Sequence, residues 1–294
     1  ECSMDREPIR EYLKSFYTAQ GTIEFEYLNE FPYTLVECRN CTLIYQQHIP
    51  NNTLMERIYE QWIDPDLSFQ RQRSNTQLST YYYYANEIIQ IIAHFKKQPH
   101  ELKIFDFGIG WARWALIVKG FGCKVFGSEL SESRIKHAQS NGIAMIERDN
   151  IPQHSFHFIN TQEVFEHIPE PLETLRYLRK SLEPDGIIKI WVPDGKNFKS
   201  KIEQMPWRHQ HSLKKALEPV SPLEHINCFN RKSLIHMAKM ADLEVAPISL
   251  SYQNPTTMAS LKPVHLVKNF LRPVHNKYRF QKGTCIFFKN KKPR

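Results

Sequence analysis

The chain has 294 residues, of which 41% are hydrophobic and 12% aromatic, and this composition is sufficient for one large core or two smaller ones. It excludes an intrinsically disordered chain, because disordered chains are poor in aromatic residues. The 39 Lys and Arg residues exceed the 31 Asp and Glu residues, which gives a formal net charge of +8. No apolar run approaches the roughly 20 residues that span a bilayer, and the first residues lack the basic start and apolar stretch of a secretory signal. We therefore expect a soluble, cytoplasmic protein that is not transmembrane, and a start at Glu1 instead of Met indicates a processed or truncated sequence.

Residues 1–75 alternate short apolar stretches with polar turns. Two strand-like runs, 33–37 and 42–45, indicate a small β unit, because β-branched and aromatic residues are frequent in them. A helix is expected to follow over about residues 53–62. We therefore predict that this part of the chain is a small β/helical accessory segment.

A leading helix is predicted within residues 76–98, because apolar residues recur there every three to four positions, which is the spacing of one helix face. These residues are Tyr81, Tyr84, Ile88, Ile92 and Phe95. We place the start of the main domain here. It covers residues 76–294 and includes a basic C-terminal region, 251–294, with the last strand.

The middle of the chain alternates strands and helices, which is typical of a parallel α/β unit. The predicted strands are 104–107, 123–127, 144–146, 156–159 and 187–192. The predicted helices among them are centred on 111–118, 131–139 and 172–182, the last with Leu182 on its apolar side. A Pro-Asp-Gly turn at 184–186, a helix over 232–240 and strands at 243–250 and 284–288 complete the pattern. The fold class that we predict is α/β, a doubly wound Rossmann-like sheet of seven strands that binds ligands beyond the carboxyl ends of its strands.

Glycine is scarce and concentrated, because five of the ten glycines lie in residues 108–127. Such a concentration indicates backbone that turns tightly or approaches a ligand. The segment 106–110, Asp-Phe-Gly-Ile-Gly, follows a predicted strand and opens a helix. Glu129 ends the next strand, and an acidic residue at that point can bind both hydroxyls of a ribose.

Two classes of nucleotide cofactor use this layout, and Arg113 distinguishes between them. Dinucleotide-binding folds need a small residue at this position so that helix and strand can pack. Asp106 would in addition lie beside a pyrophosphate and repel it. A nucleoside cofactor without phosphates is therefore favoured. No Gly-Lys-Ser/Thr follows the glycines, which excludes a P-loop.

With these residues the sequence resembles the class I S-adenosylmethionine-dependent methyltransferases, and among them the small-molecule enzymes. The first motif of that family, Asp-x-Gly-x-Gly, is residues 106–110, with Ala112 in place of a frequent third glycine. His157 departs from the family, which usually has Asp at the start of the fourth strand. The further matching blocks, in the expected order, are 125–131, 156–159, 164–168 and 182–186.

The resemblance implies S-adenosylmethionine as the cofactor, lying across the strand ends. It implies that Glu129 binds the ribose hydroxyls, that Asp106 lies beside the methionine moiety and that Leu130 lies against the adenine. The full set of residues that it assigns to the cofactor is Asp106, Gly108, Gly110, Glu129, Leu130, Asp149 and Asn150, of which the last two match the adenine-side loop only loosely.

Methyl transfer from a sulfonium is an in-line displacement, so the protein mainly aligns donor and acceptor and removes a proton where the acceptor carries one. Histidine suits the second task because its pKa lies near neutrality. His167, just past the fourth predicted strand, is the first candidate, and the resemblance supports it because many small-molecule members have Glu-His at this point. A role in capping the next helix or ordering the loop is the alternative. His225, after the fifth strand, is the second candidate.

Cys38 and Cys41 lie between two predicted strands at the spacing of half a zinc ribbon. A closed site needs two more ligands, and Cys2 is a candidate for one of them. The arrangement resembles the zinc-binding amino-terminal segment that precedes deoxysugar C-methyltransferases, which implies a structural zinc ion. Two reduced structural cysteines are the alternative.

No acidic residue follows Glu244, which leaves ten basic residues unopposed. They are Lys262, Lys268, Arg272, Lys277, Arg279, Lys282, Lys289, Lys291, Lys292 and Arg294. Such a surface attracts nucleic acid, anionic membranes or phosphorylated metabolites, unless it is only a solvated face.

The function that we predict is methyl transfer from S-adenosylmethionine to a small-molecule acceptor, such as a sugar or another biosynthetic intermediate, with an anionic acceptor suggested by the basic tail. The alternatives are an RNA methyltransferase and an inactive nucleic-acid-binding protein with the same fold. The sequence lacks both an Asn-Pro-Pro-Tyr-type motif and a catalytic-cysteine motif, which makes nucleic acid the less favoured partner.

Overall fold

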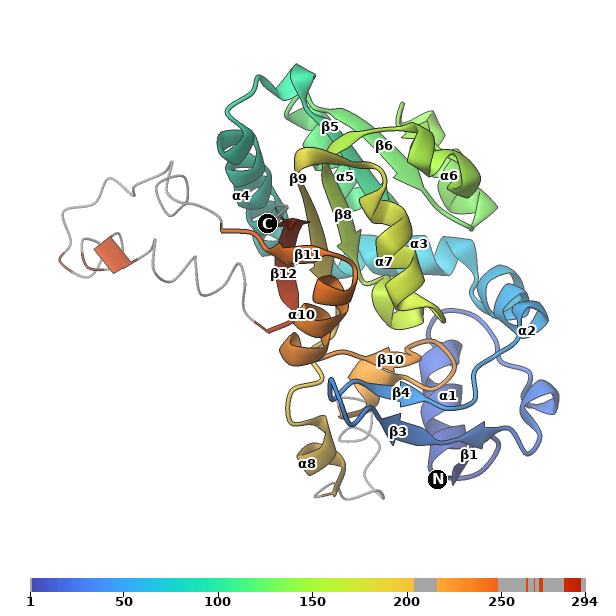
Figure 1. The fold of residues 1–294 in the computed structure, drawn as a ribbon. Helices are drawn as coiled ribbons and strands as arrows, with labels where there is room; N and C mark the ends of the chain where they lie inside the picture. Colours follow the sequence, from blue (N-terminus) through green and yellow to red (C-terminus); the bar gives the residue numbers. More distant parts are fainter. Residues whose placement is uncertain are drawn as a thin grey trace.

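The computed structural model describes residues 2–203, 216–247 and 283–291, together with positions 263, 267, 270 and 271. A seven-stranded sheet forms its centre, in the order β11-β12-β9-β8-β5-β6-β7 (Figure 1). The strands are β5 (Lys103–Phe107), β6 (Lys124–Ser128), β7 (Ala144–Met145), β8 (Phe156–Gln162), β9 (Leu182–Trp191), β11 (Leu243–Val245) and β12 (Cys285–Asn290). β12 is antiparallel to both of its neighbours, and the pairs from β9 to β7 are parallel. The predicted doubly wound, seven-stranded sheet is confirmed.

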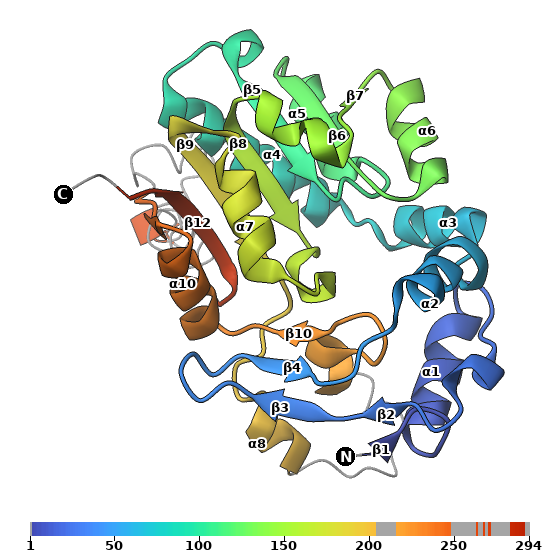
Figure 2. The same ribbon diagram turned by 45° about the vertical axis from the view of Figure 1, so that its right-hand side comes forward.

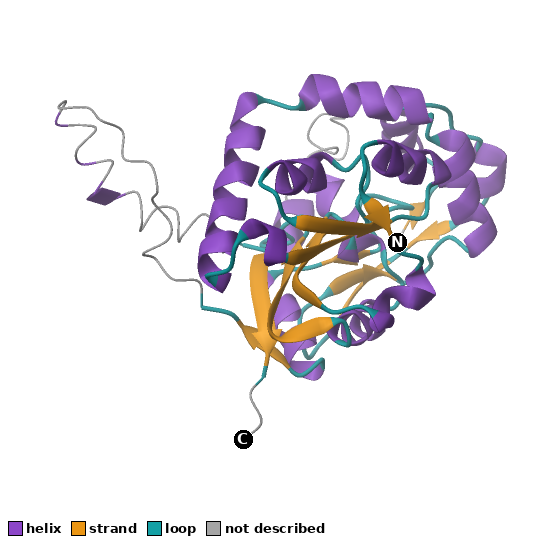
Figure 3. Cartoon of the chain, turned by 90° about the horizontal axis from the view of Figure 1, so that it is seen from above, coloured by secondary structure: helices purple, strands orange, loops and turns teal. Residues whose placement is uncertain are grey.

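Helices cover both faces of this sheet (Figure 3). On one face, α4 (Leu78–Phe95) and α5 (Arg113–Gly120) bury apolar residues against the strands, together with Ala138 of α6 (Glu132–Ser140). On the other face, α7 (Pro171–Arg179) and α10 (Arg231–Met240) contribute to a second core. The predicted apolar face of the leading helix is partly wrong, because Tyr81 is 47% exposed whereas Tyr84 and Ile88 are buried.

The start of β9 differs from the expectation. Leu182 belongs to the strand and not to the preceding helix, since it pairs with Phe156. The next paired residues are Phe158 and Ile187, so residues 183–186 bulge out of the ladder. The predicted Pro-Asp-Gly turn is therefore this bulge inside one strand.

The N-terminal segment is more helical than the sequence analysis predicted. Its elements are β1 (Cys2–Ser3), α1 (Ile9–Thr18), η1 (Phe25–Leu28), β2 (Pro32–Tyr33), β3 (Leu35–Glu37), β4 (Ile44–Gln46), α2 (Asn52–Arg57), the π-helix η2 (Ile58–Trp62) and α3 (Pro65–Asn75). Helices α1 and α3 were not predicted. The signal for α1 was present, because Ile9, Leu13 and Tyr17 recur at helical spacing and are buried.

A segment from the second half of the chain completes this N-terminal part. β10 (Asn227–Cys228) pairs with β4, which gives the three-stranded sheet β10-β4-β3 (Figure 2). The core beneath combines both segments, and its buried members include Ile9, Leu13, Trp62, Phe198, Leu217, Val220 and Leu223. Phe198 begins the short helix α8 (Phe198–Glu203), and the turn η3 (Pro99–Glu101) precedes β5.

Most of the predicted basic tail lies outside the described residues, namely Lys262, Lys268, Arg272, Lys277, Arg279, Lys282, Lys292 and Arg294. Lys289 is described, and it forms an ion pair with Glu244 at 3.3 Å. None of the helices in the described part of the chain is long and apolar enough to cross a bilayer.

Candidate active site

The turn between β5 and α5 holds its backbone in the left-handed region, with φ of 71° at Gly108 and 54° at Gly110. A Cβ at Gly108 would lie 2.6 Å from Cγ2 of Val164, so a larger residue does not fit there. A Cβ at Gly110 would meet nothing within 4 Å, so the backbone at Gly110 faces open space. The turn therefore presents accessible backbone at the carboxyl end of β5, where sheets of this class bind their ligands.

Glu129 follows β6 and directs its carboxylate toward this turn. Its Oε2 accepts a hydrogen bond from the amide of Gly110 at 2.9 Å, and its Oε1 accepts one from the amide of Leu130 at 2.8 Å. Oε1 also accepts a hydrogen bond from the amide of Ser131 at 3.3 Å, so these bonds fix the carboxylate and Oε2 keeps a lone pair for a hydroxyl donor. The Leu130 side chain is 84% exposed, which offers an apolar surface beside the acid. The arrangement fits a nucleoside whose ribose donates to Glu129.

Asp106 is buried near the end of β5. Asn160 of β8 donates a hydrogen bond from Nδ2 to its Oδ1 at 2.7 Å. Burial raises the pKa of Asp106 to about 7, against the opposing effects of Asn160 and the Lys189 charge. A nearby cation would therefore shift Asp106 toward its ionised form at neutral pH. Asn160 was missed by the sequence analysis, although a polar residue at the end of an apolar run was a usable signal.

The remaining residues predicted for the cofactor lie in η4 (Arg148–Gln153), the turn after β7. Asp149 is exposed there, and Asn150 accepts a hydrogen bond from Gln153 at 3.0 Å. His157 lies at the opposite end of β8, where its Nδ1 accepts a hydrogen bond from the amide of Lys103. The departure from the family at His157 is therefore remote from the carboxyl edge of the sheet.

Helix α3 of the N-terminal segment reaches the glycine turn. Trp111 of this turn donates from Nε1 to the Ser68 hydroxyl at 3.2 Å. The ring of Phe69 lies 5.0 Å from both the Trp111 ring and the His137 ring, centroid to centroid. The N-terminal segment therefore contributes side chains beside the predicted cofactor site.

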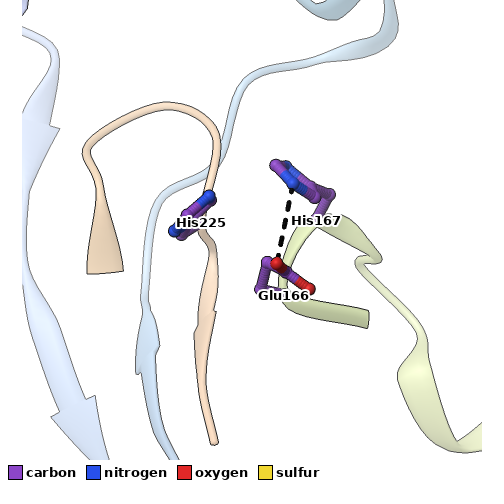
Figure 4. Close-up of side chains that lie close together, drawn as sticks. All are labelled: Glu166, His167 and His225. Carbon is purple, nitrogen blue, oxygen red and sulfur yellow. Dashed lines mark ion pairs between the residues drawn. The ribbon is translucent and has the colours of Figure 1, made fainter. Parts of the chain in front are cut away.

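The two predicted bases lie together at the carboxyl end of β8 (Figure 4). His167 is in η5 (Phe165–His167), and its ring centroid is 4.8 Å from that of His225 in an edge-to-face arrangement. The Tyr59 hydroxyl of η2 lies 3.3 Å from Nδ1 of His167. Burial lowers the pKa of His167 to about 3 and that of His225 to about 4. Both imidazoles are therefore neutral at pH 7. Their pKa values lie well below the near-neutral pKa for which histidine was selected in the sequence analysis.

Glu166 precedes His167 and has no exposed surface. Its Oε1 lies 4.0 Å from Nε2 of His167. Burial raises the pKa of Glu166 well above its ordinary value. Neither carboxylate oxygen has a hydrogen-bond partner within the part of the chain that the structure describes.

The N-terminal segment also holds the loop that carries His225. Gln46 donates from Nε2 to the carbonyl oxygens of Ser221 and His225, both at 3.0 Å. The Tyr17 hydroxyl donates to Oε1 of the buried Glu224 at 2.7 Å. The sequence analysis missed these contacts, because their partners are more than 170 residues apart.

The structure brings Cys38 and Cys41 together but not Cys2. Hydrogen bonds from the amides of Cys41 and Asn40 lower the pKa of Cys38, and burial raises that of Cys41. Cys2 pairs with Tyr33, which lies five residues before Cys38, and five extended residues span roughly 16 Å. Across residues 2–203, 216–247 and 283–291 no group of three close metal-ligand atoms contains these cysteines, so a zinc site at Cys2, Cys38 and Cys41 stays a prediction.

The chain is similar to known methyltransferases in its sequence pattern and its fold. A family model described as a methyltransferase domain matches residues 78–248, more than half of the chain. The structure of the plantazolicin methyltransferase BpumL with a monoazolic desmethylPZN analog and SAH is 14% identical, with a TM-score of 0.50 over 81% of this chain and 94% of that chain. The plantazolicin methyltransferase BamL is 12% identical, with a TM-score of 0.48 over 81% and 95%. PKMT2 from Rickettsia typhi is 14% identical, with a TM-score of 0.46 over 73% and 54%.

Proposed function

The chain belongs to the methyltransferase-domain family and is an S-adenosylmethionine-dependent methyltransferase, and we propose that it methylates a small molecule held between the glycine turn and the pair His167 and His225. The bound cofactor supplies an electrophilic methyl group on a sulfonium. Glu129 and the Gly110 backbone bind and orient its nucleoside end, and Asp106 provides negative charge near its positive end.

The observation that supports this proposal best is the contact of the Tyr59 hydroxyl with His167. Burial raises the pKa of Tyr59, and among the charges that act on it is that of Glu129. Arg134 lies 3.9 Å from the Glu129 carboxylate. Tyr59 therefore contacts the imidazole pair and lies within electrostatic range of the predicted cofactor acid, which supports one site for donor and acceptor.

The neutral imidazoles give the acceptor end its chemistry. A neutral ring nitrogen accepts a hydrogen bond from a hydroxyl and orients the oxygen toward the methyl donor. The neutral imidazole of His167 would take the proton of the acceptor hydroxyl as the oxygen gains the methyl group. A hydroxylated small molecule, such as a sugar, is the acceptor class that we propose, and an anionic group on it remains part of the proposal because of the basic tail.

Calorimetric titration with S-adenosylmethionine and S-adenosylhomocysteine tests the cofactor half. We expect one equivalent to bind, and Glu129→Ala to weaken binding at least tenfold because the ribose hydroxyls lose their acceptor. Glu132→Ala is the matched control, since Glu132 is exposed and pairs with Lys136 on the same helix. No binding to the unmodified protein would overturn the proposal.

Release of S-adenosylhomocysteine in the presence of hydroxylated acceptors tests the other half. His167→Ala should lose turnover and keep its cofactor affinity. Near-normal turnover of that variant would remove His167 from the mechanism.

A further inference from the structure

We propose that Glu166, His167 and His225 bind one divalent transition-metal ion, such as Zn²⁺, at the acceptor end of the site. One potential ligand atom from each residue lies within 4.8 Å of the others, and within the described chain this is the one such group of three (Figure 4). Two of the ligands come from η5, and the third comes from the loop before β10.

Glu166 gives the first argument. Its side chain is fully buried, and both carboxylate oxygens lack a hydrogen-bond partner among the described residues. The distance of 4.0 Å from Oε1 to Nε2 of His167 is too long for a hydrogen bond. A buried carboxylate needs a compensating charge or donors. A cation between Glu166 and the two imidazoles would satisfy both oxygens.

The orientation of the imidazoles gives a second, independent argument. Nδ1 of His225 lies 2.5 Å from the carbonyl oxygen of Glu218, and because a carbonyl only accepts, Nδ1 carries the hydrogen and Nε2 keeps its lone pair. Nδ1 of His167 lies 3.3 Å from the Tyr59 hydroxyl, which can accept in the same way. Metal-binding histidines have such partners on the second nitrogen, because the partner fixes the ring and its tautomer.

The donor set favours particular ions. Two imidazole nitrogens and one carboxylate suit Zn²⁺ or Fe²⁺ better than Mg²⁺ or Ca²⁺, which prefer oxygen ligands. Ligand atoms around a tetrahedral ion are about 3.4 Å apart, so small side-chain rotations would close the site. Three protein ligands leave a position open, and the His167 side chain is 24% exposed, which gives access to that position.

The open position links the ion to the acceptor, and this part of the inference rests on the proposed function. A hydroxyl oxygen that binds a divalent ion has a lowered pKa, and its proton would pass to solvent water at the exposed part of the His167 side chain as the oxygen takes the methyl group. The imidazoles would then act through the ion that they hold. With a metal ion at this position, the proposed acceptors are small molecules whose hydroxyl oxygen can bind the metal.

Metal content of the full chain tests the site without any activity measurement. The Cys38→Ser/Cys41→Ser double variant is the background, because thiolates at that pair also bind zinc. After chelation, reloading with Zn²⁺ and dialysis, we expect one equivalent of zinc in this background. Glu166→Gln and His225→Gln should each lower the affinity at least tenfold. Glu170→Gln, at an exposed position of the same segment, should retain the full equivalent.

Thermal unfolding separates loss of the site from loss of the fold. Zn²⁺ should raise the melting temperature of the background protein and leave that of Glu166→Gln unchanged, while metal-free Glu166→Gln melts no lower than its parent because it buries no unpaired acid. Less than a tenth of an equivalent of zinc in the background protein would overturn the inference. Zinc affinity of Glu166→Gln and His225→Gln equal to that of the background protein would also overturn it. The calorimetric titration with S-adenosylmethionine does not depend on the metal site. It therefore tests the proposed function independently of the metal inference.

Discussion

Asp106 combines burial with a position beside the predicted methyl donor. Its folded-state pKa of about 7 lies above the ordinary value of 3.8. The acid is therefore protonated in the folded protein between these values, whereas in the unfolded chain it is ionised. The stabilising contribution is complete below about pH 4 and is lost as the pH rises through about 7.

The prediction at this scale concerns stability against pH. From about pH 5 to about pH 8 the unfolding free energy should fall because of Asp106, by up to about 3 kcal/mol. Asp106→Asn should lose this part of the pH dependence, since an amide does not titrate and still accepts a hydrogen bond from Asn160. Urea unfolding at the two pH values measures it. An unchanged pH dependence in the variant would contradict the shifted pKa.

The glycine turn and its proximity to Glu129 were predictable because the information is local. Gly108, Gly110 and Glu129 lie in one strand-turn-helix-strand unit, which brings them to the same edge of the sheet, and their role toward a nucleoside stays a prediction. The partners of Glu166 and His167 were not predictable, because His225 is nearly sixty positions further along the chain. A metal-ligand set assembled from separate segments leaves no short-range spacing to recognise.

Between elements, a buried ion pair joins helix α4 to strand β9. Nζ of Lys189 lies 2.7 Å from Oε1 of Glu87, and neither side chain has exposed surface. Trp114 of α5 donates from Nε1 to the other oxygen of Glu87 at 3.0 Å. The pair therefore connects helices α4 and α5 with strand β9 of the sheet.

Lys189→Met should lower the unfolding free energy by about 3–5 kcal/mol, because it leaves the Glu87 carboxylate buried without its counter-charge. The double variant Glu87→Gln/Lys189→Met should recover at least half of the loss, since Gln still accepts from Trp114 and carries no charge. Chemical denaturation of both variants measures the difference. Equal destabilisation of the single and double variants would contradict an electrostatic origin.

The observed helices and strands match the predicted ones where the sequence has strong periodicity. They differ from the predicted ones where contacts between distant parts of the chain determine the structure. The parallel strands and α10 were predicted, because apolar runs and helical spacing are local signals. The bulge at 183–186 was read as a turn, because Pro-Asp-Gly has the same local preference in either setting. Helix α3 was missed because, of its eleven residues, none is buried, which leaves no apolar stripe.

At the scale of the whole molecule, tyrosine hydroxyls join the N-terminal segment to the loop of His225. Tyr17 donates to the buried Glu224, and Tyr33 donates to the carbonyl oxygen of Val220 at 2.7 Å. Each of these bonds is buried, so loss of a hydroxyl leaves an acceptor without its donor.

Tyr17→Phe should lower the unfolding free energy by about 1–3 kcal/mol and make the N-terminal segment more susceptible to limited proteolysis. Tyr27→Phe is the matched control, because Tyr27 is exposed and its ring keeps the contact with Arg57. Its effect should stay within about 0.5 kcal/mol. Similar values for the two variants would show that the Tyr17 hydroxyl does not hold the two parts together.

The pairing of β4 with β10 has a consequence for synthesis. Residues 2–75 leave the ribosome before strand β10 and the apolar residues Phe198, Leu217, Val220 and Leu223 that complete their core, which are made more than a hundred residues later. At about 5–20 residues per second this interval lasts roughly 6–30 s. During that time the edge of β4 that will meet β10 and the apolar side of α1 are uncovered, so residues 2–75 should depend on chaperones until residues 198–228 have been made.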